Sequence, residues 1–268
     1  MQIFNGKKES EIILAGLKKE IKKRRLRPRL AVISVGEDSS SEVFVRNKKK
    51  AGREIGVSVL EYKFRGNTKE KNVFKKIREL NGDKSVNGII VQLPLPQFFN
   101  AKKTISGIVA KKDVDGFCGG KRYFEQPLPA AIFFAMRKNG KTFRKKKIVA
   151  LVNSDIFGKT LRDFLKKKRI KADYLLRGDF KPAMLESADI IISVCGVPGF
   201  IKGSMIKKGA VLIDSGIVVK KGKKVVGDID RDSVFGKASF LTPVPGGIGP
   251  LNVAFLLKNV YLSAKNHG

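Results

Sequence analysis

Short apolar runs rich in Val, Ile and Leu alternate with longer segments of helical period along this chain. Apolar runs of about four to eight residues suit strands that are buried on both faces, as they are in a parallel sheet. Parallel neighbours need a crossover connection, and the helical segments between the runs can supply it. The alternation therefore predicts an α/β fold with a mainly parallel sheet.

The expected elements divide between the two halves of the chain. In the first half, strands are predicted at residues 30–35, 57–62 and 88–92, and helices at residues 10–23, 42–55 and 71–80. In the second half, strands are predicted at residues 148–152, 173–176, 189–194 and 210–213. A helix at residues 130–138 should cross between the halves, and a last helix at residues 251–264 should pack back on the first half.

Turn-rich sequence between Asp113 and Pro129 marks the expected change of domain. We predict two α/β lobes with a cleft between them. The first lobe comprises residues 1–138 together with the C-terminal helix, residues 248–268. The second lobe, residues 139–247, is predicted to be Rossmann-like and doubly wound.

The net charge of the chain indicates which classes of partner are candidates. There are 56 Lys and Arg residues against 24 Asp and Glu, which gives a net charge of +32. Such a field attracts anions over about 8–10 Å at physiological salt, so nucleic acid and an acidic small substrate are both candidates. The basic residues are spread along the whole chain and Trp is absent, which makes nucleic acid the weaker candidate.

Cysteine usage and the N-terminus indicate the compartment. Cys118 and Cys195 are far apart in sequence, which argues against a disulfide framework or a metal cluster, and no metal is predicted. No apolar run approaches the roughly 20 residues that cross a bilayer, and the first residues lack the layout of a signal peptide. A cytoplasmic location is expected.

The first candidate site lies where a predicted strand gives way to a helix. Ser39 and Glu42 are spaced as a capping box that opens the helix. Ser41, Phe44 and Lys48 follow at i, i+3 and i+7 and therefore share one helix face. Beside apolar neighbours the Lys48 ammonium could be partly desolvated, with a lowered pKa; the alternative is an ordinary solvated lysine.

Three further segments place polar residues on stiff or tight backbone. In residues 91–96, two prolines present Gln92 at the carboxyl end of a buried strand, where α/β proteins bind ligands. Residues 112–116 form a paired-acid turn, and such acids are often only turn formers. Residues 242–250 hold three glycines and three prolines, so their backbone can come close to a flat ligand; the alternative is a stiff interdomain connector.

Together and in this order, these four segments resemble the methylenetetrahydrofolate dehydrogenase/cyclohydrolase family, and the similarity runs from about Leu30 to the last helix. Its most specific pieces are residues 92–96, 112–116 and 243–250. Members of that family oxidise 5,10-methylenetetrahydrofolate to the methenyl form with NADP or NAD, then hydrolyse it to 10-formyltetrahydrofolate. The resemblance implies an enzyme of one-carbon metabolism, a folate-binding first lobe, an NAD(P)-binding second lobe and a homodimer.

The resemblance also assigns roles by position. Lys48 matches the lysine that manages proton transfer during hydrolysis, Gln92 the residue that holds and tunes it, and Asp115 the acid that hydrogen-bonds the pterin. Surrounding positive charge is expected to lower the pKa of that lysine. The remaining implied substrate contacts are Ser41, Phe44, Val91, Leu93, Pro245, Gly246, Gly247, Gly249 and Pro250. The implied cofactor contacts are Val152, Asn153, Ser154, Gly158, Arg177 and Ile217.

Two positions depart from the family pattern. Phe44 stands where a tyrosine is usual, so the ring can still stack on the pterin but the hydroxyl is missing. Relatives carry Gly-Arg-Ser after the first strand of the nucleotide lobe, where this chain has Val152, Asn153 and Ser154. A branched residue resists the positive φ of a tight turn, and the arginine is lost. We therefore expect weak dinucleotide binding, with hydrolysis the better preserved activity.

The choice between NADP and NAD stays close to open. Arg177, just after the predicted strand 173–176, can pair with a 2′-phosphate, or it is one more surface charge. Asp179 could instead accept from an unphosphorylated ribose; the basic lobe favours NADP. A second hypothesis is a non-catalytic scaffold that binds folate or nucleic acid, and the intact Lys48, Gln92 and Asp115 argue against it.

Overall fold

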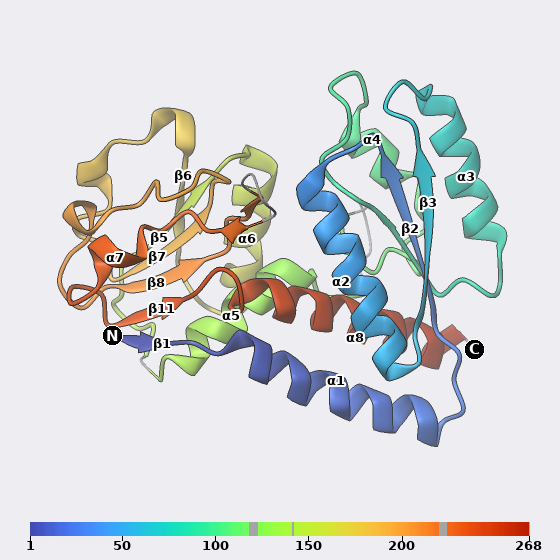
Figure 1. Ribbon diagram of the computed structural model, residues 1–268, viewed down its shortest axis with the longest axis horizontal. Helices are drawn as coiled ribbons and strands as arrows, with labels where there is room; N and C mark the ends of the chain where they lie inside the picture. The colour runs from blue at the N-terminus through green and yellow to red at the C-terminus, as the bar shows by residue number, and fades with distance from the viewer. Residues whose placement is uncertain (118–122, 141, 220–223, 268) are drawn as a thin grey trace. The chain divides into compact units, whose positions relative to one another are not determined.

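The computed structural model (Figure 1) describes residues 1–117, 123–140, 142–219 and 224–267. It divides into two compact units. Ser10–Pro127 and Asn252–Gly268 form one, which we call the three-stranded unit after its sheet. Met1–Glu9 and Leu128–Leu251 form the other, the six-stranded unit. This arrangement confirms the predicted α/β class.

The three-stranded unit is built on a parallel sheet with strand order β3-β2-β4. Its strands are β2 (Arg29–Val35), β3 (Ser58–Phe64) and β4 (Gly88–Val91). Its helices are α2 (Ser39–Ile55), α3 (Glu70–Gly82) and α4 (Ala101–Ser106), with most of α1 (Gly6–Lys23) and α8 (Ile248–His267). The chain passes from the central strand β2 to β3 on one side of it, and then crosses to β4 on the other side.

Helices cover both faces of this sheet, with α2 and α3 on opposite sides (Figure 1). Leu30 and Val32 of β2 point into one core, which also takes apolar side chains from α1, α2 and α8. Ala31 and Ile33 point into the other core, against α3. The α8 members of the first core are Val253, Leu256, Leu257, Val260 and Tyr261. The last helix therefore packs in the unit of the first half, as predicted.

The six-stranded unit has strand order β1-β11-β8-β7-β5-β6, and all its strand pairs are parallel. Its strands are β1 (Gln2–Ile3), β5 (Ile148–Val152), β6 (Asp173–Leu176), β7 (Ile190–Val194), β8 (Val211–Asp214) and β11 (Phe240–Thr242). Its helices are α5 (Pro127–Lys138), α6 (Asp155–Lys167) and α7 (Arg231–Val234), and β9 (Val218–Val219) pairs with β10 (Val225–Val226) as a small antiparallel ribbon. The strand order is doubly wound, with its switch point between β5 and β7.

The units differ from the predicted lobes 1–138 and 139–247. Met1–Glu9 joins the six-stranded unit because Gln2 and Ile3 pair with Phe240 and Leu241 of β11. Nearly all of α5 belongs there too, since Phe133 packs edge-on against Phe164 of α6, with ring centroids 6.3 Å apart. A two-residue strand has no periodicity from which it could have been recognised.

The predicted capping box at the start of α2 is wrong. The helix begins at Ser39, and its N-cap is Asp38, whose Oδ1 accepts from the backbone N–H of Ser41 at 2.7 Å. Asp38 has extended backbone, as an N-cap residue does, and aspartate is as good a cap as serine. Glu42 lies in the first turn and pairs with Lys63 instead of reaching back to Ser39.

The same substitution, Gly to Ala, should have opposite effects on the free energy of unfolding at two helical glycines. A Cβ on buried Gly52 of α2 would lie 2.7 Å from Cγ2 of Val59 and 2.8 Å from the carbonyl oxygen of Val57, so Gly52→Ala should cost about 1–3 kcal/mol of unfolding free energy. Exposed Gly16 of α1 has nothing within 4 Å, so Gly16→Ala should stabilise by about 1 kcal/mol. Urea unfolding of both variants checks this, and a loss of stability in Gly16→Ala would contradict it.

Candidate active site

A buried lysine lies at the carboxyl edge of the three-stranded sheet. The side chain of Lys48 in α2 is 6% exposed, and its Nζ donates to Oε1 of Gln92 at 2.6 Å. Gln92 comes directly after β4, and its backbone N–H donates to the carbonyl of Ile33 in β2 at 2.8 Å. Because β2 and β4 are neighbours in the sheet, Gln92 lies beside α2, the helix that follows β2.

A shared carbonyl fixes this arrangement. The carbonyl oxygen of Leu93 accepts from Nε2 of Gln92 at 2.8 Å and from Oγ of Ser41 at 3.1 Å. The first bond engages the amide nitrogen of Gln92, so the amide oxygen is the atom that faces Lys48. The second ties the first turn of α2 to the segment after β4. Ser41, Gln92 and Lys48 thus belong to one connected cluster, as the sequence predicts.

Burial lowers the pKa of Lys48 to about 8, and the negative charge of Asp115 opposes this shift. Two causes were expected, desolvation beside apolar neighbours and surrounding positive charge. Removal of the ammonium from water is the cause here, and no positive neighbour contributes. The basic residues of the chain are mostly at the surface, where water and salt screen them.

Asp115 is the second titratable group of the cluster. Burial raises its pKa to about 6, the charge of Lys48 lowers it, and the charge of Asp113 raises it further. Asp113 itself shapes the turn: its Oδ1 accepts from the backbone N–H of Gly116 at 3.0 Å. The two acids of the turn therefore differ, because Asp113 bonds within the turn and Asp115 acts on Lys48.

Two residues that the sequence did not single out hold this turn. Nζ of Lys112 donates to the carbonyl oxygens of Leu80, Asn81 and Asp83 at the end of α3, at 2.8, 2.9 and 2.7 Å. Nδ2 of Asn259 in α8 donates to the carbonyl of Val114 at 2.8 Å. The sequence offered a signal only for Lys112, which adjoins the paired acids.

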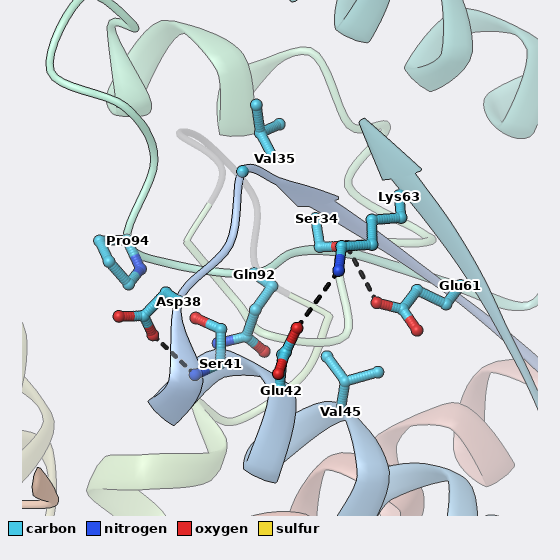
Figure 2. A pocket seen from close by; sticks show the side chains of 11 residues that line it. Ser34, Val35, Asp38, Ser41, Glu42, Val45, Glu61, Lys63, Gln92 and Pro94 are labelled. Atoms are coloured by element: carbon cyan, nitrogen blue, oxygen red, sulfur yellow. Dashed lines mark hydrogen bonds and ion pairs between the residues drawn. The ribbon is translucent and has the colours of Figure 1, made fainter. Parts of the chain in front are cut away.

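A small hollow opens beside Gln92 (Figure 2). Glu42 pairs with Lys63 across it, Nζ to Oε1 at 3.2 Å, and Oγ of Ser34 donates to Oε1 of Glu61 at 3.0 Å. Glu61 and Lys63 are two apart on β3, so strand alternation places them on one face. The lining residues are Ser34, Val35, Gly36, Asp38, Ser41, Glu42, Val45, Glu61, Lys63, Gln92 and Pro94.

The other predicted substrate residues of this unit differ in exposure. The Phe44 ring is half-buried, with its centroid 5.8 Å from Nζ of Lys48. Leu93 is 44% exposed. Val91 is 4% exposed and packs in the core of the sheet, so only its backbone could reach a ligand.

The predicted glycine-rich loop belongs to the six-stranded unit. Gly246 has φ +101°, and its carbonyl oxygen accepts from the N–H of Lys7 at 2.9 Å. A Cβ on Gly247 would lie 2.5 Å from the carbonyl oxygen of Pro243, so only glycine fits there. Gly249 and Pro250 lie in the first turn of α8, and Pro245 is exposed. Their role in folate binding stays a prediction.

The predicted obstacle in the nucleotide loop is absent. Val152 is the last residue of β5 and pairs with Leu176 and Val194 in ordinary strand geometry. None of residues 152–158, all of which the structure describes, has a positive φ. Ser154 caps α6, its Oγ accepting from the N–H of Phe157 at 3.2 Å. The steric argument against Val152 is therefore wrong, because the turn is made without a left-handed residue.

The remaining cofactor residues lie at or near the carboxyl edge of this sheet. A Cβ on Gly158 would come within 2.4 Å of the Tyr174 ring, so this glycine lets α6 pack against β6. Exposed Arg177 follows β6, and its Nη1 donates to the carbonyl of Cys195 at 3.3 Å. Asn153 is exposed and directly follows β5, and Ile217 is half-buried between β8 and β9. Helix start, close-packed glycine and arginine together fit a dinucleotide.

Other site classes find little support in the described part of the chain. Residues 1–117, 123–140, 142–219 and 224–267 contain no group of three or more His, Cys, Asp or Glu side chains that could hold a metal ion. Cys195 is a buried free thiol, and Cys118 lies outside the described residues. None of the described helices has both the length and the apolar character needed to cross a membrane.

Comparison with known proteins decides the family. Residues 4–115 match the tetrahydrofolate dehydrogenase/cyclohydrolase catalytic domain, and residues 127–268 match the NAD(P)-binding domain of the same family. The chain belongs to the tetrahydrofolate dehydrogenase/cyclohydrolase family. The family model thus names the unit that carries Lys48, Gln92 and Asp115 as catalytic.

Relatives of full length support this assignment to the tetrahydrofolate dehydrogenase/cyclohydrolase family. The bifunctional protein FolD of Agathobacter rectalis is 40% identical over 96% of both chains. The crystal structure of the bifunctional FolD enzyme from Campylobacter jejuni is 31% identical, with a TM-score of 0.89 over 99% of both chains. The FolD structure from Trypanosoma brucei, complexed with NADP cofactor and inhibitor, is 27% identical, with a TM-score of 0.90 over 98% of this chain and 97% of that one.

The opposed influences on Lys48 give a prediction. Asp115→Asn removes the charge that raises the pKa of Lys48 and leaves the burial that lowers it, so this pKa should fall below about 8. A ¹³Cε NMR titration of the lysines measures it, with the Lys48 signal assigned by its loss in Lys48→Met. Lys63, whose pKa is raised by its bond to Glu42, is the internal control and should not move. An unchanged or higher pKa for Lys48 would contradict the coupling.

Proposed function

We propose that this protein oxidises 5,10-methylenetetrahydrofolate to the methenyl form with NADP or NAD and hydrolyses the product to 10-formyltetrahydrofolate. The observation that carries the proposal is the Lys48–Gln92–Asp115 cluster, in the unit that the family's catalytic domain matches. The second unit matches the NAD(P)-binding domain, and the similar FolD proteins are named bifunctional. A non-catalytic scaffold is not favoured, because it would not require a buried, titratable lysine.

In the proposed hydrolysis, Lys48 moves the proton. Water that adds to the methenyl carbon must lose a proton, and a neutral amine can accept it. With a pKa of about 8, about a tenth of the Lys48 side chains is neutral at pH 7, against about one in three thousand for a lysine at its usual value. By lowering the pKa of Lys48, burial therefore provides the neutral amine that acts as the base in this step.

Gln92 keeps Lys48 in place through both protonation states. Its Oε1 only accepts, and both the amine and the ammonium have an N–H to donate. A carboxylate in that place would favour the charged form and raise the pKa of Lys48. The neutral amide holds the side chain without removing its basicity.

Asp115 orients the substrate in this proposal. With a pKa of about 6 it is mainly ionised at pH 7, so it can accept charge-assisted hydrogen bonds from the amino-pyrimidine edge of a pterin. Phe44 offers the face of its ring to the same group. Without a hydroxyl it cannot hydrogen-bond near Lys48, which leaves proton transfer to Lys48 and solvent.

The dinucleotide would be held in the six-stranded unit. The chemistry that a bound nicotinamide supplies is acceptance of a hydride from the substrate's methylene carbon. The side-chain amide of Asn153 and the backbone N–H groups of Ser154 and the start of α6 would be donors for the phosphates, and Arg177 offers a fork for a 2′-phosphate. Since Asn153 replaces an arginine of the family pattern, we propose that oxidation is the weaker activity. The homodimer and the cytoplasmic location stay predictions.

Lys48→Met tests the hydrolytic assignment. Methionine keeps the packing of the stem but cannot accept a proton, so methenyl hydrolysis above the spontaneous rate should fall about 10²–10⁴-fold. Loss of the methenyl absorbance measures the rate. Folate should still raise the melting temperature, because the Asp115 side chain is unchanged. A variant that hydrolyses at the parental rate would remove Lys48 from the mechanism.

Arg177→Ala tests the choice of cofactor. If Arg177 binds a 2′-phosphate, the ratio of kcat/KM for NADP to that for NAD should fall on the order of tenfold. Arg144→Ala is the matched control, an exposed arginine of the same unit that precedes β5 and so lies off the carboxyl edge. An unchanged ratio would dismiss Arg177 as the selector. NADP-dependent oxidation as fast as hydrolysis in the parent would refute the weaker dehydrogenase.

A further inference from the structure

The six-stranded unit buries a carboxylate that neither proposed reaction uses. Asp228 is 0% exposed, in the segment between β10 and α7. Its Oδ2 accepts from Oγ of Ser193 at 2.7 Å and from the backbone N–H of Cys195 at 2.6 Å. Its Oδ1 accepts from the backbone N–H of Val197 at 2.8 Å. Burying a carboxylate is costly, and these three donors compensate for the lost water.

The two backbone donors belong to the loop that leaves β7, residues 195–197. This loop starts at the carboxyl edge beside β5, the switch point where doubly wound folds bind ligands. Backbone N–H groups here would otherwise have to find water or a ligand. Asp228, which lies between β10 and α7, binds two of these N–H groups and so fixes the path of the loop after β7.

Asp228 is itself rigidly placed. Its backbone N–H and that of Ile229 donate to the carboxylate of Asp214 at the end of β8, at 3.1 and 2.9 Å. A Cβ on Gly216 would lie 2.0 Å from the Asp228 carboxyl carbon, and one on Gly227 would lie 2.2 Å from Oδ2 of Asp214. Both glycines thus make room for a carboxylate.

The same loop touches two of the residues proposed to hold the dinucleotide. The carbonyl of Cys195 accepts from Nη1 of Arg177 at 3.3 Å. The carbonyl of Val194, one residue earlier, accepts from the N–H of Asn153 at 3.1 Å. The Val194–Cys195 peptide, whose N–H bonds to Asp228, therefore bonds through its carbonyl to Asn153, and the next peptide bonds through the Cys195 carbonyl to Arg177.

We infer that Asp228 is a positioning residue for the dinucleotide: it holds loop 195–197, and through it Arg177, in the geometry that binds the cofactor. The inference rests on the proposed dehydrogenase function. Asp228 does not touch the cofactor in this role. It acts through the backbone of Cys195 and Val197.

Asp228→Asn is the sharpest variant. The amide has the shape of the carboxylate but only one acceptor oxygen, so in either orientation its NH₂ faces one of the two loop N–H groups. The dissociation constant for NADP, measured by calorimetry, should rise about tenfold or more. Amide hydrogen exchange at Cys195 and Val197 should become faster, while methenyl hydrolysis stays within about twofold of the parent.

Asp189→Asn is the matched control. Asp189 directly precedes β7, the strand whose other end leads into loop 195–197. Its carboxylate accepts from the N–H of Lys147 at 2.8 Å and from Nζ of Lys207 at 2.9 Å, at the amino edge of the sheet. This variant should lose stability but bind NADP as the parent does. Equal weakening of NADP binding in both variants would mean a general structural role and overturn the inference.

Failure of the inference and failure of the function are separable. If the parent binds NADP and Asp228→Asn binds it equally well, the inference falls alone. A parent that does not bind NADP removes the dehydrogenase proposal and the inference with it. If Asp228→Asn does not fold, the parent still decides: NADP must slow amide exchange at Cys195 and Val197, and unchanged exchange there would overturn the role of the loop.

Discussion

Parallel pairing of strands governs where chemistry can sit in this protein. All described strand pairs except the β9–β10 ribbon are parallel, so each strand must be followed by a crossover that starts at the same edge of its sheet. Loops from distant parts of the sequence therefore meet at the carboxyl edges. Gln92 and α2 meet in this way in one unit, and the loops after β5, β6 and β7 meet in the other. Both proposed sites are consequences of this geometry.

In each unit a charged side chain binds uncharged backbone groups that a helix end or a loop leaves without partners. The ammonium of Lys112 bonds to three carbonyls at the end of α3, and the carboxylate of Asp228 bonds to two N–H groups of the loop after β7. Helix ends and loops leave such backbone groups without partners, and a side chain of the right sign can satisfy several at once. The loops are thereby held by directional bonds, which an apolar contact could not provide.

The strands were the part of the fold that the sequence predicted best. Buried β5 and half-exposed β6 lie at the predicted bounds, residues 148–152 and 173–176, because short apolar runs between turn residues admit few other structures. The Lys48–Gln92 contact was also predicted, by the resemblance to the family, in which the residue at the Gln92 position holds the lysine. What failed depends on three-dimensional context. Asp38 competes with Ser39 for the cap, Val152 ends its strand without a left-handed turn, and β1 is too short for any pattern. Lys112 and Asp228 were missed because most of their partners are backbone atoms, which leave no trace in side-chain identity.

The burial of Lys48 also bears on how such a chain can change over evolutionary time. Its pKa is set by the protein around it and by Asp115, and the side chain is only 6% exposed. Substitutions that add or remove exposed lysines act across solvent, where their influence is weak. The proton-transfer chemistry is in that sense insulated from the outer composition of the molecule. A lineage could accumulate a net charge as large as +32 in response to its surroundings while the reacting groups keep their acidities.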